Sequence, residues 1–206
     1  MISQVYLNLK KMKETISDKP LSKALKIVIK GKKSQNPQLL ILMGLPGSGK
    51  SYVANYLNEK YGFSVISGEN VTYALFGTEK CSDSEYALAY KMVRKAALKL
   101  LKVGYSVVID GTNLKYAFRE EIYKEVENSF KPHVLYLYID EKTAIKRITN
   151  RGENFGDIKK ITSQCSEETY RNFKKQLEEP GEEECSFKIK SDNNVFERVD
   201  SIIDKL

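Results

Sequence analysis

Gly44-Leu45-Pro46-Gly47-Ser48-Gly49-Lys50-Ser51 is a glycine-rich stretch between an apolar run, residues 39–43, and a segment with a helical pattern. Its spacing, G-x-x-x-x-G-K-[ST], is that of a phosphate-binding loop, in which consecutive backbone N–H groups converge on phosphate oxygens. Glycine is needed where a Cβ would obstruct the turn or the close approach of the anion. The stretch therefore predicts that the chain binds a nucleoside triphosphate.

The groups of this loop have separate predicted tasks. Lys50 would place a positive charge beside the β- and γ-phosphates, and Ser51 would offer its hydroxyl to Mg²⁺. The helix that is expected to begin here turns the positive end of its dipole toward the anion. The residues predicted to bind the nucleotide are Gly44, Pro46, Gly47, Ser48, Gly49, Lys50 and Ser51.

Apolar runs and amphipathic stretches alternate along the rest of the chain. Strands that alternate with helices form a parallel sheet with right-handed crossovers, so the sequence predicts an α/β fold of three layers. Ser82 and Glu85 have capping-box spacing and predict a long helix to about Val103, with Leu88 and Met92 on its buried face. Strands are expected at 39–43, 63–66, 107–109, 134–139 and 187–189, and helices at 52–61, 82–103, 116–128, 142–151, 166–178 and 195–206.

The net charge of +7 is concentrated at the start of the chain. Residues 1–36 contain nine lysines and two acidic residues, whereas residues 37–206 contain 25 basic and 25 acidic residues. We therefore predict a basic, helical N-terminal extension over residues 1–36 and a separate domain over residues 37–206.

Two functions are open for this extension. A lysine-rich segment can attract the phosphate backbone of a nucleic acid through counterion release. Alternatively, it is an ordinary amphipathic helix that packs Leu21, Leu25, Val28 and Ile29 inward and keeps its lysines in water.

Composition also limits the class of protein. The three cysteines have neither metal-ligand nor redox spacing, so we expect free thiols in a reducing compartment. The chain has no apolar run of about 20 residues and no apolar core at its start, so we expect neither a membrane helix nor a signal peptide. These features predict a cytoplasmic protein with no membrane partner and leave its oligomeric state open.

Polar residues follow several of the predicted strands. Ligands of a parallel sheet lie beyond the carboxyl ends of its strands, so these residues are candidates for the site. Asp110 follows the buried run at 107–109 and is predicted to hold Mg²⁺ together with Ser51. Asp140 is expected to cap the following helix. The acidic stretch 178–184 is expected to be a solvated turn.

Four ordered motifs resemble those of the P-loop kinases related to polynucleotide 5′-hydroxyl kinase. They are the loop 44–51, the segment 67–77, the turn 110–113 with Arg119, and the segment 147–151. The group also includes transfer-RNA kinases and small-molecule phosphotransferases. The resemblance covers residues 38 to about 190 and implies a P-loop NTPase or kinase-like fold with ATP and Mg²⁺ as cofactors.

The resemblance also implies roles for the residues after the second strand. Glu69 stands where these kinases commonly have an aspartate that accepts the proton of the attacking hydroxyl. A glutamate keeps the carboxylate and extends its reach by about 1.5 Å. Thr72 stands where they commonly have an arginine, and threonine cannot clamp a phosphate through two parallel hydrogen bonds. The possible substrate-binding residues are Thr72, Thr112, Asn113 and Arg119.

Arg147 and Arg151 lie four residues apart on one predicted helix face, before a segment that resembles a kinase lid near residues 147–165. Guanidinium groups can stabilise the charge that develops during phosphoryl transfer. Lys50, Glu69, Arg147 and Arg151 are therefore the predicted catalytic residues.

The leading hypothesis is an ATP-dependent phosphotransferase that moves the γ-phosphate to a hydroxyl acceptor. The acceptor is either a nucleic-acid 5′-hydroxyl or a small molecule such as a nucleoside, a sugar or an antibiotic. A third hypothesis is a nucleotide-gated ATP-binding module without kinase activity.

Overall fold

The computed structural model describes residues 19–78, 81–126, 129–150 and 165–206. None of the helices in these ranges is both long and apolar enough to cross a membrane. In chain order the elements are β1 (Leu39–Met43), α2 (Lys50–Tyr61), β2 (Ser64–Ser67), α3 (Gly68–Phe76), α4 (Asp83–Lys102), β3 (Val107–Asp110), α5 (Tyr116–Val126), β4 (Pro132–Tyr138), α6 (Glu141–Thr149), α7 (Glu167–Lys174), β5 (Ser186–Lys190) and α8 (Val195–Ile203).

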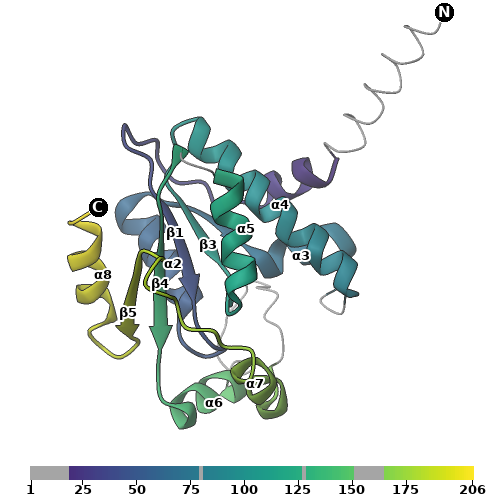
Figure 1. Ribbon diagram of the computed structural model, residues 1–206, viewed down its shortest axis with the longest axis vertical. Helices are drawn as coiled ribbons and strands as arrows, with labels where there is room; N and C mark the ends of the chain where they lie inside the picture. The colour runs from purple at the N-terminus through teal and green to yellow at the C-terminus, as the bar shows by residue number, and fades with distance from the viewer. Residues whose placement is uncertain (1–18, 79–80, 127–128, 151–164) are drawn as a thin grey trace, which may run out of the picture.

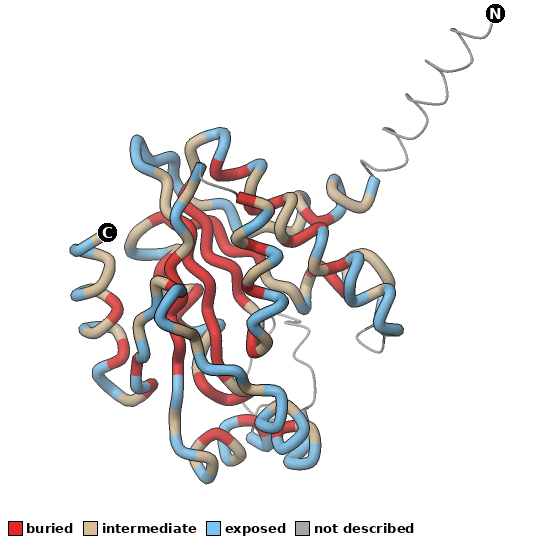
Figure 2. Tube along the Cα trace, in the orientation of Figure 1, coloured by how far each residue is buried: buried red, intermediate tan, exposed pale blue. Residues whose placement is uncertain are grey.

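The strands form a single parallel sheet in the order β2-β3-β1-β4-β5. All five residues of the central strand, β1, are buried because helices cover both faces of the sheet. Figure 1 shows the sheet between two layers of helices, and Figure 2 shows that the buried residues concentrate along its strands. The predicted α/β fold with a parallel sheet and three layers is confirmed.

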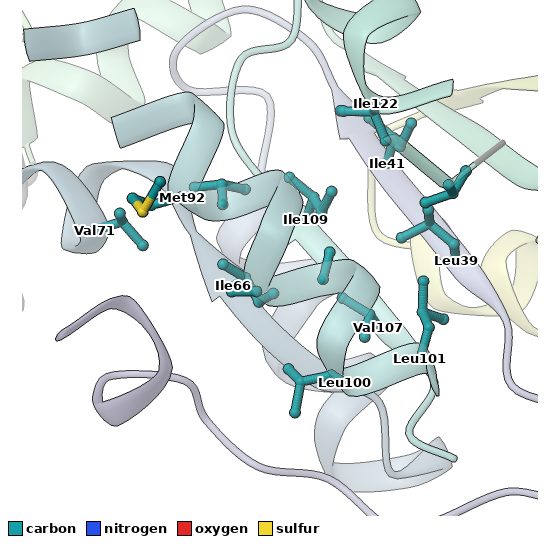
Figure 3. Close-up of a cluster of buried hydrophobic side chains, with 14 of the residues drawn as sticks. Leu39, Ile41, Ile66, Val71, Met92, Leu100, Leu101, Val107, Ile109 and Ile122 are labelled. Carbon is teal, nitrogen blue, oxygen red and sulfur yellow. The ribbon is translucent and has the colours of Figure 1, made fainter. Parts of the chain in front are cut away.

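Alternate residues of β1 fill two separate hydrophobic cores. Leu39 and Ile41 pack in the core that α4 and α5 cover, as Figure 3 shows, whereas Leu40 and Leu42 pack in the core that α2 and α8 cover. The alternation arises because successive side chains of a strand point to opposite faces. Burying each of these side chains stabilises the fold by roughly 1.5–3 kcal/mol. The packing on both faces fixes β1, and with it the start of the glycine-rich loop.

The described part of the N-terminal extension packs against the domain. Residues 19–26 are helical, and Ala24 within them is fully buried. Leu21, Leu25 and Val28 pack against the same core as α4. The aliphatic side chains of this segment thus pack as one of the two hypotheses expects, except for Ile29, which is 44% exposed.

The same segment covers the edge of the sheet. Ile29 and Val65 of β2 exchange two backbone hydrogen bonds, of 3.1 and 2.8 Å, and Lys33 forms a second antiparallel bridge with Tyr105. An open edge strand would be a template for association with another chain. The extension therefore protects β2, while the boundary at residue 36 stays a prediction.

A few details differ from the sequence-based expectations. β4 begins at Pro132, two residues early, and so includes the buried His133. The capping box of Ser82 and Glu85 is present, but Leu88 is 37% exposed. Met92 is buried as expected, and the buried face of α4 also includes Ala89 and Val93, so only Leu88 of the two predicted residues lies outside it.

Candidate active site

The glycine-rich loop leaves β1 and enters α2 with a backbone that glycine adopts far more readily than other residues. Gly47 and Gly49 have φ angles of 81° and 86°, in the left-handed region. A Cβ on Gly47 would lie 2.5 Å from the Ala144 carbonyl oxygen, and a Cβ on Gly49 would lie 2.8 Å from Ser191 Oγ. Both positions therefore require glycine for conformational and for steric reasons.

Helix α2 begins at Lys50 without a side-chain cap. Gly49 occupies the N-cap position, and the first turn contains no acidic residue. The first N–H groups of a helix have no partner within the helix, so this end carries partial positive charge. Serine or aspartate side chains cap α3, α4, α6 and α7 at the corresponding place. The uncapped end of α2 is thus suited to receive an anion.

Two side chains of the loop add further donors. Lys50 Nζ donates a hydrogen bond to the Leu45 carbonyl at 3.0 Å, so its ammonium group lies over the loop. Ser48 is buried, and within the described ranges its hydroxyl has no hydrogen-bond partner. Ser51, at the start of α2, is exposed. A positive charge, an unpaired buried hydroxyl and an uncapped helix end together fit a polyphosphate.

The turn after β3 is bonded to the loop from one side. Asp110 ends β3 and is 9% exposed. Asn113 Nδ2 donates to the Leu42 carbonyl at 2.7 Å, and the Gly44 N–H donates to the Thr112 carbonyl at 3.1 Å. These bonds join the turn to the end of β1 and to the first residue of the loop. They place the turn that follows Asp110 next to the predicted phosphate site.

Arg147 approaches the loop from the other side. It lies on α6, which follows β4, the second neighbour of β1 in the sheet. Arg147 Nη1 donates to the Gly47 carbonyl at 3.3 Å, and Nη2 donates to the Ser191 carbonyl at 3.2 Å. The guanidinium group thus places positive charge next to the loop and ties it to the segment after β5.

Arg119 lies behind the turn after β3 and is fully buried. Its guanidinium forms a two-armed ion pair with Glu184, both N–O distances being 2.7 Å. Nη1 also donates to the carbonyls of Asn113 and Leu114, each at 3.0 Å. The described contacts of Arg119 therefore support the turn, and its predicted contact with a substrate stays a prediction.

Glu184 is a structural residue that the sequence did not reveal. The stretch 178–184 was expected to be a solvated turn, and for Glu184, which is 6% exposed, this expectation is wrong. Tyr123 also donates a hydrogen bond to its carboxylate. Burial acts to raise the pKa of Glu184, but the hydrogen bonds from Arg119 and Tyr123 outweigh it and lower that pKa below its usual value.

Glu69 and Thr72 occupy different environments on α3. Glu69 is exposed in the first turn of the helix, where a carboxylate is favoured by the helix dipole. Thr72 is 5% exposed, and its hydroxyl donates to the Gly68 carbonyl at 2.9 Å. Its hydroxyl thus serves α3 itself, and a contact between Thr72 and a substrate stays a prediction.

An aromatic cluster lies beside Glu69. Tyr90 of α4 stacks on Phe118 of α5, with ring centroids 5.1 Å apart and an interplanar angle of 11°. Burial raises the pKa of Tyr90, a hydrogen bond with Thr112 opposes this, and the negative charge of Glu69 raises it further. Tyr90 thus interacts with Thr112 and is influenced by the charge of Glu69. The helical spacing of Tyr86 and Tyr90 was the available sequence signal for this cluster.

The structure thus brings together most of the predicted site. Arg147 bonds the loop before α2, and Glu69 and Thr112 follow the neighbouring strands β2 and β3. Arg151 and most of the predicted lid, residues 151–164, lie outside the described residues.

This fold and this site define a P-loop protein of the kinase-like class. A protein-family model described as an AAA domain matches residues 39–180, and the chain belongs to that family. The relationship to P-loop kinases that the motifs indicated is confirmed. No curated protein is significantly similar to the chain in sequence.

Solved structures with the same fold include three of different kinds. A gluconokinase from Sinorhizobium meliloti 1021 has a TM-score of 0.57 and 19% identity, over 81% of this chain and 90% of that chain. Chaetomium thermophilum Kti12 in complex with ADP-AlF3 has a TM-score of 0.60 and 21% identity, over 81% of this chain and 97% of that chain. A chain of the Pnkp1/Rnl/Hen1 complex has a TM-score of 0.51 and 23% identity, over 65% of this chain and 45% of that chain. At these identities the similarity shows the fold alone.

Proposed function

We propose that this protein transfers the γ-phosphate of ATP to a hydroxyl acceptor. The observation that carries the proposal is the pair of charged groups on either side of the loop. The Asp110 carboxylate comes from the end of β3, and the Arg147 guanidinium bonds the Gly47 carbonyl from α6. Phosphoryl transfer needs a metal-binding carboxylate and a cation around one triphosphate, and this arrangement supplies both.

The donor half of the site consists of the loop and its two flanking groups. Backbone N–H groups from Gly44 to Ser51 and the Lys50 ammonium bind the triphosphate. The Ser51 hydroxyl and the Asp110 carboxylate would hold Mg²⁺, because this ion prefers oxygen ligands. Bound Mg²⁺ neutralises charge on the β- and γ-phosphate oxygens. Arg147, joined by Arg151, stabilises charge on the transferred group.

The acceptor half is centred on Glu69. Its carboxylate takes the proton of the acceptor hydroxyl while the acceptor oxygen bonds to the γ-phosphorus. The bond between the γ-phosphorus and the bridging oxygen breaks at the same time, and ADP leaves. Thr112 follows β3 and Glu69 follows the neighbouring strand β2, so we assign Thr112 to help position the acceptor.

Of the possible acceptors, the 5′-hydroxyl of a nucleic acid is our first candidate. Phe118 and Tyr86 are each 39% exposed next to Tyr90, and exposed aromatic rings can stack on a nucleobase. A small molecule such as a nucleoside, a sugar or an antibiotic is the second candidate. It is favoured by Thr72, which offers no clamp for an acceptor phosphate.

The test measures transfer of radiolabelled γ-phosphate from ATP to 5′-hydroxyl oligonucleotides and to a panel of nucleosides, sugars and aminoglycosides. Glu69→Gln is expected to lower kcat by about 10²–10⁴-fold, the usual contribution of a general base. Glu59→Gln, an exposed carboxylate at the end of α2, is the matched control and should leave kcat unchanged.

The outcomes separate the candidates. Transfer to the small molecules alone replaces the first acceptor with the second. Tight ATP binding with no transfer to any acceptor refutes the enzyme and leaves a nucleotide-gated binding module. Equal kcat for Glu69→Gln and Glu59→Gln excludes Glu69 as the base.

A further inference from the structure

A row of lysines follows the solvent-facing side of α4. Lys91, Lys95, Lys99 and Lys102 recur every three or four residues, so they lie on one side of the helix. The buried residues of α4, among them Met92 and those in its later turns, occupy the opposite side. At 1.5 Å per residue, the row extends over about 16 Å. Its first lysine directly follows Tyr90, so one end of the row lies near the acceptor half of the active site.

A second row comes from the segment before the sheet. Lys23, Lys26 and Lys30 are exposed on the helix over residues 19–26 and the strand-like segment that follows it. Figure 1 shows this helix beside α4. A groove of about 600 Å³ lies between them, lined by Leu21, Ser22, Leu25, Lys26, Lys30 and Lys99. The groove therefore has lysines on both of its sides.

Negative charge does not balance this groove within the part of the chain that the structure describes. The sequence has no acidic residue from Lys19 to Asn58 or from Tyr86 to Ile109. The acidic residues of α4 lie in its first turn. Among the described residues, the three groove lysines form no ion pair. Like charges around a hollow repel one another and concentrate a positive potential, which a bound polyanion would relieve.

We propose that this groove, which we name the lysine groove, binds the phosphate backbone of a nucleic acid. The proposal does not require that the loop site transfers phosphate. A membrane surface fits the groove less well, because Leu21 and Leu25 pack against the core. A helix that binds lipid instead presents a wide apolar face outward. Lys26 and Lys30 on one side of the groove and Lys99 on the other match a charged strand that lies between the two elements.

The test uses the full chain and the triple variant Lys26→Gln/Lys30→Gln/Lys99→Gln. Binding of a fluorescein-labelled single-stranded oligonucleotide is followed by polarisation over a series of salt concentrations. Each lost lysine–phosphate contact lowers the slope of log K against log salt by about 0.7, so the triple variant should lose about 2. We also expect an affinity at least about tenfold weaker at low salt.

The matched control is Lys131→Gln/Lys175→Gln/Lys205→Gln, which removes the same charge from exposed lysines outside the groove. It should keep nearly all of the affinity and of the slope. Lys99→Gln alone should lower the slope by about 0.7, which tests whether α4 contributes as well as the extension. Unchanged melting temperatures show that the variants are folded.

Two results would overturn the proposal. If the groove and control variants weaken binding equally, net charge alone accounts for it and the groove is no site. If the groove variant loses binding to phosphatidylserine-containing vesicles but keeps its oligonucleotide affinity, the groove is a membrane-binding surface instead. Neither result depends on ATP or on phosphoryl transfer.

Discussion

Replacing Glu184 by alanine would leave the buried Arg119 guanidinium without its carboxylate, and we expect a large loss of stability. The two side chains are 0% and 1% exposed and are joined by two bonds of 2.7 Å. Removing one partner of a buried ion pair costs about 3–5 kcal/mol. Gly181 N–H and the Tyr123 hydroxyl would lose the same acceptor, so the cost should lie toward the upper end. Since domains are stable by about 5–15 kcal/mol, this loss is a large fraction of the total stability.

The assay is urea denaturation followed by far-ultraviolet circular dichroism at neutral pH. The free energy of unfolding should fall by about 4–5 kcal/mol, with an unchanged dependence on urea concentration. Glu182→Ala is the matched control, because Glu182 is an exposed glutamate in the same turn. It should change the free energy of unfolding by no more than about 0.5 kcal/mol.

A double variant separates the ion pair from the other bonds of Arg119. In Arg119→Met/Glu184→Leu no charge remains buried, so part of the lost stability should return. Recovery should be incomplete, because the carbonyls of Asn113 and Leu114 lose their donor. The reasoning is refuted if Glu184→Ala is as stable as Glu182→Ala, or if the double variant is less stable than Glu184→Ala.

Two further predictions concern the loop and the same ion pair. Gly47→Ala should abolish the rise in melting temperature that ATP produces, because the new Cβ would meet the Ala144 carbonyl. Gly77 has a similar φ of 72° but open space around it, so the control variant Gly77→Ala should keep that rise. Because the pKa of Glu184 lies below the ordinary glutamate value of 4.5, its carboxylate stabilises the fold at pH values above 4.5. This contribution is lost as the pH falls through the lowered pKa of the folded protein. The stability difference between the native protein and Glu184→Gln, measured in urea, should therefore be constant from about pH 7 to 5 and shrink below about pH 4; a difference that grows on acidification would contradict it.

The parts of the fold that the sequence predicted are encoded locally. The loop at 44–51 has its own spacing, β1 has an uninterrupted apolar run, and Ser82 with Glu85 marks the start of α4. Each of these signals depends on interactions within a few residues or on burial from both faces. The predicted donor half of the site rests on the same kind of local signal, so it could be proposed before any contact between distant segments was known.

The parts that could not be predicted depend on contacts between distant segments. Arg119 and Glu184 are 65 residues apart, and nothing near Glu184 distinguishes it from its exposed neighbours in an acidic turn. Ile29 pairs with Val65 although the sequence predicted that residues 1–36 are helical. Periodicity shows which residues of a segment share a face, but it does not identify the segment against which that face packs.

The same distinction explains why the acceptor is harder to assign than the donor. Eight consecutive residues define the predicted triphosphate site, whereas the proposed acceptor side draws on residues of α3, α4 and α5. The side chain of Thr72 is buried and bonds its own helix, so a charged acceptor needs its cations from elsewhere. The lysine row of α4 begins at Lys91, next to Tyr90, and could supply them along a bound strand. An arginine missing from α3 is therefore compatible with a nucleic-acid acceptor, provided that the lysine groove binds the strand as proposed.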